Sequence, residues 1–295
     1  MSLRRGPDTA QSIAKRRSTQ AERSIFLHIK VGPYYEVTMS LRPIVLLLLA
    51  CRLVGADPAR VLFIGNSYTG TNALPKVFTE MTRSAGRKVP EVKSSTPGGR
   101  TLENHLTIKG SMDLIDAGGW DVVVLQGHSQ EAALSETDPA KRKAFLGSAH
   151  ALCERVRAKS PQARIILYMT WARHADLWKD PKGRELADKL GKDPADMQAR
   201  IRKWYETAAD AERCELAPVG LAWEANYRSA SPLRLHTPDQ SHPVFAGTYL
   251  ASLVIFGRIY GPVKEPITWT GEGKAKVDDG DAARLHRFAE TALAR

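Results

Sequence analysis

The chain of 295 residues is 43% hydrophobic, which is enough to bury the core of a globular domain and excludes a disordered or fibrous protein. Its formal net charge of +11 would suit a nucleic-acid-binding protein, but residues 1–38 alone contribute a net +4. The other basic residues are interleaved with acidic ones, as on solvated helix faces. We therefore expect no nucleic-acid partner.

A secretory signal peptide is predicted for residues 39–56. A basic start at Arg42 is followed by the apolar run 44–50 and then by small residues, the order found in such leaders. The apolar run is too short to cross a bilayer, which takes about 20 residues. The alternative to a signal peptide is a buried strand or helix of the fold. On the first interpretation residues 1–38 are a non-native or disordered extension. The mature protein then begins at Asp57 and is secreted or periplasmic.

The three cysteines leave alternatives open. Cys51 ends a Leu-Leu-Ala-Cys sequence similar to the lipobox of bacterial lipoproteins, which would give a lipid anchor, although cleavage after Ala56 is preferred. Removal of the leader leaves Cys153 and Cys214, an even number that allows one disulfide in an oxidising compartment. Two buried free thiols are at least as compatible with the pattern around them.

Residues 57–295 form the predicted folded domain, in which short apolar runs alternate with longer amphipathic segments. This alternation predicts an α/β fold, a three-layer α/β/α sandwich around a mostly parallel five-stranded sheet. The predicted strands are Arg60–Ile64, Val89–Lys93, Asp121–Leu125, Arg164–Met169 and Cys214–Pro218. The predicted helices are Ala73–Ala85, Leu102–Asp116, Pro139–Lys159, Pro194–Glu212 and Val244–Tyr260.

The segment 171–193 does not follow this alternation. It places Trp171 and Trp178 among many charged residues, directly after the fourth predicted strand. Ligands of open α/β sheets bind beyond the carboxyl ends of the strands, so we expect an insertion here to form a lid or a wall of a substrate site. The alternative is a surface elaboration without a function.

The first predicted strand runs into the turn Gly65-Asn66-Ser67, after which a helix is predicted. Such a turn places Ser67 at the carboxyl edge of the sheet and at a helix N-terminus, where unpaired backbone N–H groups stabilise developing negative charge. Ser67 is thus a candidate nucleophile. The alternative is an ordinary helix N-cap, the commonest role of serine after a strand.

A second candidate group lies just before the final helix, in the sequence His236-Thr-Pro-Asp239-Gln-Ser-His242-Pro243. An aspartate and a histidine three residues apart on a tight loop can face each other, so the carboxylate fixes the imidazole tautomer while the other ring nitrogen faces a nucleophile. The pair alone could equally be a surface turn or half of a metal site, but nothing nearby has metal-ligand spacing.

Together the two segments resemble the SGNH (GDSL-like) hydrolase superfamily over nearly all of residues 56–260. The matching features are Gly-x-Ser after the first strand and Asp-x-x-His-Pro near the C-terminus, with Gly-Asn-Ser in place of the commoner Gly-Asp-Ser, as in a subset of members. The resemblance implies the flavodoxin-like fold of that superfamily. It also implies a catalytic triad of Ser67 as nucleophile, His242 as base and Asp239, without a metal or an organic cofactor.

The resemblance further implies an oxyanion hole. The backbone N–H of Ser67 is one donor, and Gly99, in the Pro-Gly-Gly turn after the second strand, matches the superfamily's second donor; an ordinary turn is its alternative. The third donor is usually an asparagine in Gly-x-Asn, which this chain lacks. A glutamine amide can donate the same bond, and we choose Gln126 at the end of the third strand, with Gln130 second.

Four residues near the strand ends are assigned to substrate binding: Asn66, His128, Gln130 and Trp171. His174 and His236 are further candidates for the mouth of the site, because polar residues on strand-end loops gather there. His105 and His150 lie in helical patterns and are expected to be structural. Trp171, Trp178 and Trp223 could stack on sugar rings, or they belong to the core.

These residues predict a serine esterase that forms and then hydrolyses an acyl-enzyme. Exported members of the superfamily with Gly-Asn-Ser and a glutamine in the third block resemble carbohydrate esterases, so O-acetyl groups on carbohydrate are the first choice of substrate. The alternatives are a lipid or thioester hydrolase of the same fold and an inactive glycan-binding protein. The sequence does not specify the oligomeric state.

Overall fold

The computed structural model describes residues 26–30, 36–40, 57–261 and 267–295, and the chain divides into two units, Met1–Ala56 and Asp57–Arg295. In the first unit, strand β1 (Phe26–Lys30) pairs antiparallel with β2 (Glu36–Ser40). The strand pair lies in the predicted N-terminal extension, except that Met39 and Ser40 at its end belong to the predicted signal peptide. Residues 41–56, which make up most of the predicted signal peptide and include Cys51, lie outside the described residues.

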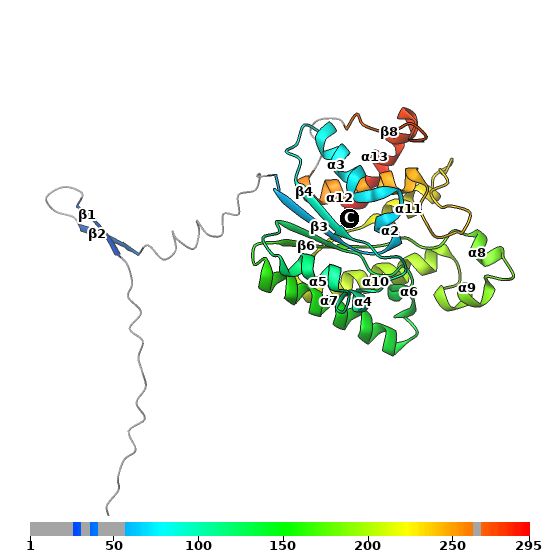
Figure 1. The fold of residues 1–295 in the computed structure, drawn as a ribbon, viewed down its shortest axis with the longest axis horizontal. Helices are drawn as coiled ribbons and strands as arrows, with labels where there is room; N and C mark the ends of the chain where they lie inside the picture. The colour runs from blue at the N-terminus through cyan, green and yellow to red at the C-terminus, as the bar shows by residue number, and fades with distance from the viewer. Residues whose placement is uncertain (1–25, 31–35, 41–56, 262–266) are drawn as a thin grey trace, which may run out of the picture. The chain divides into compact units, whose positions relative to one another are not determined.

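The second unit is built on a five-stranded sheet of order β4-β3-β5-β6-β7, in which every neighbouring pair is parallel (Figure 1). Its strands are β3 (Arg60–Ile64), β4 (Glu91–Ser95), β5 (Val122–Leu125), β6 (Arg164–Tyr168) and β7 (Glu215–Ala217). The predicted parallel α/β sheet is confirmed. Its order is that of flavodoxin-like folds.

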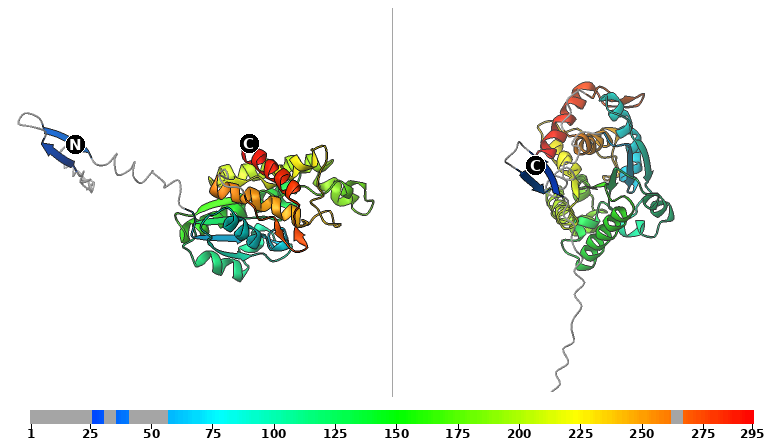
Figure 2. Two further views of the ribbon diagram at one scale, coloured as in Figure 1. Left: turned by 90° about the horizontal axis from the view of Figure 1, so that it is seen from above. Right: turned by 90° about the vertical axis from the view of Figure 1, so that its left-hand side faces the viewer.

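Helices cover both faces of the sheet, as Figures 1 and 2 show. The helices that pack together on one face are α3 (Leu74–Ser84), α11 (Val219–Tyr227), α12 (Phe245–Tyr260) and α13 (Asp279–Leu293). The other face carries α4 (Leu102–His105), α5 (Lys109–Asp116), α6 (Glu131–Leu134), α7 (Pro139–Lys159) and α10 (Pro194–Glu212). The three-layer arrangement predicted from the sequence is therefore present.

The central strands read as unbroken apolar runs because both of their faces are covered. Every residue of β5 is buried, and so are the last four residues of β3 beside it. Helix α12 is apolar on nearly every side for the same reason, since it packs against α3, α11, α13 and the edge of β7. The core thus lies between the central strands β3 and β5 and the helices that cover them.

The structure departs from the predicted elements most clearly in three ways. The helix predicted over Leu102–Asp116 is two helices, α4 and α5, because the backbone of Ile108 between them is extended (φ −77°, ψ 109°). The second strand begins two residues later than predicted, at Glu91, and is largely exposed at the sheet edge. The helices α11 and α13 were not predicted at all.

The remaining described elements are short. Ser67–Gly70 forms helix α2 and Thr71–Ala73 the 3₁₀ turn η1, which together lead from β3 into α3. The predicted insertion contains α8 (Asp176–Lys179) and α9 (Arg184–Leu190), and a strand pair of β8 (Gly271–Glu272) and β9 (Ala275–Lys276) precedes α13. Among the described residues, no helix combines the length and the apolar character needed to cross a membrane.

Candidate active site

The predicted site residues gather at the carboxyl edge of the sheet. The strand order reverses between β3 and β5, and in open α/β sheets the crevice at such a reversal is where ligands bind. Ser67 follows β3, Gly99 follows β4, and the segment from Gln126 follows β5. The topology therefore brings residues from three strands to one place.

Ser67, His242 and Asp239 form a continuous hydrogen-bonded chain. Ser67 Oγ lies 2.8 Å from His242 Nε2, and His242 Nδ1 lies 2.5 Å from Asp239 Oδ2. A carboxylate can only accept, so Nδ1 carries the ring proton and Nε2 is left free to accept the hydroxyl proton of Ser67. This geometry is what a serine nucleophile and its general base require.

Asp239 is held as a carboxylate by the loop around it. Its Oδ1 accepts hydrogen bonds from the hydroxyl of Thr237 (2.6 Å) and from the backbone N–H groups of Ser241 and His242 (2.9 Å each). Partial burial raises the pKa of Asp239, but the bonds from Thr237, His242 and Ser241 outweigh it and hold the pKa well below its ordinary value. The carboxylate that faces His242 is thus charged at any pH near neutrality.

The loop that carries the histidine is fixed from two sides. The Tyr68 hydroxyl lies 2.9 Å from Ser241 Oγ, and the indole N–H of Trp171 donates to the Ser241 carbonyl (3.0 Å). The side chain of Asn72 donates to the carbonyl of Pro243 (3.1 Å). Residues adjacent to the serine therefore hold residues adjacent to the histidine, which sets the distance between the two reacting groups.

The turn at the serine is shaped by Gly65, Asn66 and Gln126. A Cβ atom on Gly65 would lie 2.7 Å from Gln126 Oε1, so glycine alone fits there. Asn66 is the N-cap of α2: its Oδ1 accepts from the Tyr68 N–H (3.0 Å), and its Nδ2 donates to the carbonyl of Arg100 (2.8 Å). The buried amide of Asn66 thus ties loops together. Asn66 also lines the pocket over Ser67, so its contact with a substrate stays a prediction.

Gln126 does not occupy the position predicted for the third oxyanion donor. It is fully buried, and its Oε1 accepts from the Asn66 N–H (2.9 Å) and the Thr69 hydroxyl (2.8 Å). Its Nε2 donates to Asn66 Oδ1 (3.0 Å) and to the Gly127 carbonyl. Both ends of the amide are engaged below the serine, because the side chain points under the strand end and not over it.

A pocket of about 340 Å³ opens over Ser67. Besides Ser67 and His242, it is bordered by residues after three other strands, among them Gly99, His128, Ser129 and Arg173. Gly99 is exposed there with φ of 68°, a conformation that favours glycine. Gln130 does not border this pocket; its backbone N–H donates to His128 Nδ1 (3.3 Å). The sequence analysis missed Ser129 and Arg173, which no motif marks.

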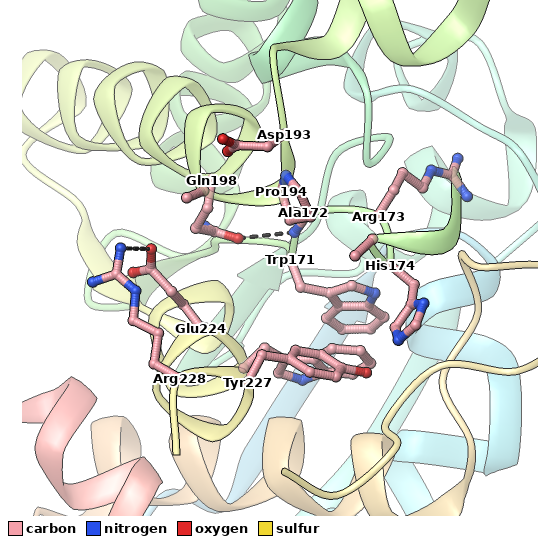
Figure 3. Close-up of a pocket in the computed structure, with 13 residues that line it drawn as sticks. Trp171, Ala172, Arg173, His174, Asp193, Pro194, Gln198, Glu224, Tyr227 and Arg228 are labelled. Carbon is pink, nitrogen blue, oxygen red and sulfur yellow. Dashed lines mark hydrogen bonds and ion pairs between the residues drawn. The ribbon is translucent and has the colours of Figure 1, made fainter. Parts of the chain in front are cut away.

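A second cavity of about 320 Å³ adjoins the first and is drawn in Figure 3. The predicted insertion supplies part of its wall, at Arg173, His174 and Asp193, and α11 supplies Tyr227 and the ion pair of Glu224 with Arg228 (2.8 Å). An insertion that walls a cavity beside the site agrees with the prediction for this segment.

The tryptophans belong to the core and offer little surface to a ligand. Trp171 is stacked between Tyr68 and Trp223, with ring centroids 4.3 and 3.9 Å away, and both tryptophans are 1% exposed. Trp178 is partly buried and donates to the carbonyl of Gly191 (2.9 Å). Trp171 therefore contributes to the site by holding Ser241, and its role as a stacking platform for sugar rings is not supported by its burial.

The other histidines separate into two groups. His128 borders the catalytic pocket and His174 the adjoining cavity, as expected for residues at the mouth. His236 is buried behind them, between the Tyr227 hydroxyl (2.7 Å) and the Ala172 carbonyl (3.0 Å). His105 is buried against Ser111 Oγ (2.7 Å), which fits its expected structural role.

Two cysteines of the described residues lie away from Ser67, one in helix α7 and one directly before strand β7. Cys153 and Cys214 are free thiols whose Sγ atoms are 3.5 Å apart, between α7 and the start of β7. Within the described ranges, no three side chains of histidine, cysteine, aspartate or glutamate converge as a metal site would require.

Comparison with known proteins supports the fold. No protein-family model and no curated protein matches the sequence. Among solved structures, a DUF4886 family protein from Bacteroides uniformis matches with a TM-score of 0.65 and 19% identity, over 80% of this chain and 94% of its own.

Two further solved structures are similar to the chain. A lipase/acylhydrolase from Enterococcus faecalis has a TM-score of 0.52 and 14% identity, over 70% of this chain and 98% of its own. A catalytic mutant of an acetylxylan esterase from Geobacillus stearothermophilus has the same TM-score of 0.52 and 14% identity, over 69% and 95%.

The fold and the position of the site define a parallel α/β sandwich with its reactive residues at the carboxyl edge of the sheet. Within that class, the fold is the one shared by these lipase/acylhydrolase and acetylxylan esterase structures. This similarity confirms the fold that the resemblance to the SGNH hydrolase superfamily implies.

Proposed function

We propose that this protein is a serine esterase that removes acetyl groups from carbohydrate. The observation that carries the proposal is the chain of hydrogen bonds from Ser67 Oγ through His242 to Asp239, placed at the floor of an open pocket. The fold shared with an acetylxylan esterase and a lipase/acylhydrolase supports ester hydrolysis in general. A small, open pocket of about 340 Å³ suits a short acyl group on a polar alcohol.

In the proposed reaction, His242 Nε2 takes the hydroxyl proton as Ser67 Oγ attacks the ester carbonyl carbon. Asp239, already a carboxylate, stabilises the imidazolium that forms. His242 then returns the proton to the departing alcohol oxygen. Water, deprotonated by His242 in turn, attacks the acyl-enzyme and releases acetate and free Ser67.

The negative charge on the carbonyl oxygen needs donors that face the pocket. The backbone N–H groups of Ser67 and Gly99 remain the first two, since both residues border the pocket. For the third donor we propose Ser129 and no longer Gln126. The Ser129 hydroxyl accepts a hydrogen bond from Arg173 Nη2 (3.3 Å) and so keeps its own hydrogen for the oxyanion. Ser129→Ala should then slow acyl transfer by about 10²- to 10³-fold.

The test is hydrolysis of p-nitrophenyl acetate and of acetylated sugars by the full chain and by Ser67→Ala. We expect turnover that is fastest with acetate and is lost in the variant, whose folding is checked by circular dichroism. If the well-folded protein released no acetate from any of these esters, the esterase proposal would be rejected and a glycan-binding function would take its place.

A longer acyl group is the second candidate. The cavity of about 320 Å³ beside the catalytic pocket has aromatic side chains in its wall, among them Tyr227, and could receive an acyl chain. A series of p-nitrophenyl esters of increasing chain length separates the two, because a rate that rises with chain length would assign a lipid-like or thioester substrate.

A further inference from the structure

Arg173 is the one described residue that borders both the catalytic pocket and the adjoining cavity. It follows β6 in the segment next to the catalytic loop. In Figure 3 its side chain extends away from the side of the cavity where Glu224 and Arg228 form their ion pair. A guanidinium at this point can contact a substrate whose ester lies at Ser67 and whose alcohol extends toward the cavity.

The charge of Arg173 has no acidic partner. Among the described residues, no carboxylate oxygen lies within the 4.0 Å limit for an ion pair with its guanidinium. Its one side-chain bond is from Nη2 to Ser129 Oγ (3.3 Å), and its Nε is buried without any hydrogen-bond partner. The nearby Asp176 is already shared by His174 (3.0 Å) and Arg234 (3.7 Å).

The two histidines that border the catalytic pocket, His128 and His242, carry no negative charge that could pair with Arg173. Asp239 is paired with His242. Burial lowers the pKa of His128, and the positive charges of Arg173 and Lys141 lower it further, so this imidazole is neutral at pH 7. Arg173 is thus a positive charge beside the serine without an ion-pair partner among the described residues, and a partly buried cation of this kind favours an anionic ligand.

Arg173 is also held in a fixed position. Its backbone N–H contacts Met197 Sδ (3.3 Å), the N–H of Ala172 donates to Gln198 Oε1 (2.8 Å), and the N–H of His174 donates to the Gln240 carbonyl (3.1 Å). The last of these bonds ties the segment directly to the loop of His242. The backbone that carries the Arg173 side chain is therefore fixed before a ligand arrives, which reduces the entropy that binding loses.

We propose that Arg173 recognises an anionic group, a carboxylate or a sulfate, on the alcohol part of the substrate. The inference rests on the proposed acetyl esterase function. An acetyl group carries no charge, so an anionic group on the substrate must belong to the alcohol part. The substrate class is then an O-acetylated acidic sugar. The planar guanidinium binds either oxyanion through paired N–H donors, and the reaction leaves the anion unchanged.

The kinetic test uses three acetylated methyl glycosides that differ only at the primary alcohol of the sugar: neutral glucoside, glucuronide with a free carboxylate, and glucoside sulfated at that position. Acetate release is measured for the wild type, Arg173→Gln and Arg173→Lys. We expect the ratio of kcat/KM for an anionic over the neutral ester to fall about 10- to 100-fold in Arg173→Gln, mainly through KM, with partial retention in Arg173→Lys.

The matched control is Arg234→Gln, because Arg234 is an exposed arginine on the same side that borders neither cavity. It should leave the ratio unchanged. Equal loss on neutral and anionic esters in Arg173→Gln would contradict the proposal and assign Arg173 to the oxyanion or to structure. A wild type without preference for either anion would also overturn it, while turnover of the neutral ester keeps the esterase proposal intact.

Binding gives a readout that does not need turnover. In the full-length Ser67→Ala protein, calorimetry should show methyl glucuronide or the sulfated glucoside binding at least about 10-fold more tightly than methyl glucoside, with an affinity that falls as salt is added. Adding Arg173→Gln should remove the difference. Equal binding of all three ligands would reject anion recognition even if every ester were hydrolysed, and the carboxylate and sulfate arms show which anion is preferred.

Discussion

Glu131 is a buried carboxyl group beside the catalytic pocket. It is 7% exposed, at the start of α6, and its Oε2 accepts a hydrogen bond from the backbone N–H of His128 (2.7 Å). Burial raises the pKa of Glu131 from 4.5 to about 7, against the opposing effect of the backbone N–H groups of His128 and Leu102. Its protonation therefore changes within the pH range in which the protein is expected to work.

The raised pKa makes a prediction about stability. Between pH 4.5 and about 7 the folded state keeps a proton on Glu131 that the unfolded state has lost, so this contribution is complete at low pH and disappears as the pH rises. Glu131→Gln should therefore gain stability relative to the wild type from pH 5 to pH 8, by about 1–3 kcal/mol.

The measurement is urea unfolding across that range. The variant is compared with the wild type at each pH, because burial also lowers the pKa of His105 to about 4 and of His236 to about 3, which gives the opposite slope in both proteins. An exposed glutamate in β8 supplies the control, Glu272→Gln, which should track the wild type. Parallel stability curves for Glu131→Gln and the wild type would show that Glu131 does not carry this effect.

For individual residues, the sequence predicted which side chains would lie close together, but not the direction in which each side chain points. Ser67, Asp239 and His242 come together because the end of a parallel strand and a tight loop each determine where a side chain lies. Gln126 sits at a strand end too, yet its amide turns below the sheet edge to bond Asn66. That choice depends on what lies beneath the strand, which a linear pattern does not contain.

Helix α12 offers a prediction at the scale of an element, because it contains two glycines in different surroundings. A Cβ on Gly247 would lie 2.6 Å from the Trp223 ring and 2.7 Å from the Leu235 carbonyl, and neither can move easily. A Cβ on Gly257 would meet the end of the flexible Leu293 side chain. Glycine to alanine within a helix otherwise gains up to about 1 kcal/mol.

We therefore expect Gly247→Ala to lower the free energy of unfolding by about 1–3 kcal/mol, while Gly257→Ala changes it by less than about 1 kcal/mol. Urea denaturation of both variants gives the comparison. Because Trp223 stacks on Trp171, which holds the histidine loop, Gly247→Ala should also slow ester hydrolysis. A stable, fully active Gly247→Ala protein would contradict this view of the packing.

Cys153 and Cys214 link two other elements, α7 and β7, and carry a redox prediction. The hydrogen bond from Cys153 lowers the pKa of the Cys214 thiol, and Arg157 lowers it further, so Cys214 is the thiol that attacks first. With oxidised glutathione, the pair should lose two protons and two electrons to form a disulfide as the glutathione disulfide is reduced.

The bond would close a loop between residues 61 positions apart and stabilise the fold by up to about 4 kcal/mol. Thermal unfolding after oxidation and removal of the reagent should show a higher midpoint. Cys153→Ser, treated in the same way, should show no shift. If titration still finds both free thiols in the treated wild type, the two Sγ atoms cannot move from 3.5 Å to bonding distance and the redox prediction is wrong.

Elements were predicted well where one pattern dominates. Continuous apolar runs gave the central strands, and Pro139–Lys159 and Pro194–Glu212 begin and end as predicted, since an N-cap aspartate and a proline mark both starts. The helices α11 and α13 were not predicted because α11 is nearly all apolar, and because the Asp-Asp-Gly sequence that starts α13, with Asp278 as its N-cap, is equally typical of a turn. The break between α4 and α5 lies at Ile108, whose extended backbone no pattern in the sequence marks.

For the whole molecule, the division of the chain at Ala56 coincides with the predicted cleavage site. We expect protein exported by a cell to begin at Asp57, because residues 39–56 have the sequence pattern of a leader. Mass spectrometry of the exported protein measures its first residue. Retention of Met1 would disprove the leader, and a lipid-modified N-terminus at Cys51 would replace cleavage after Ala56 by lipid anchoring.

The hydrogen bond between Ser67 and His242 joins residues 175 positions apart. A ribosome makes the chain from its N-terminus, so the serine emerges long before its base exists, and every nascent or prematurely terminated chain that ends before the histidine carries a serine no more reactive than a free alcohol. On the proposed function, such a protein cannot attack esters while it is being made. Only complete chains would therefore contribute to the measured hydrolytic activity.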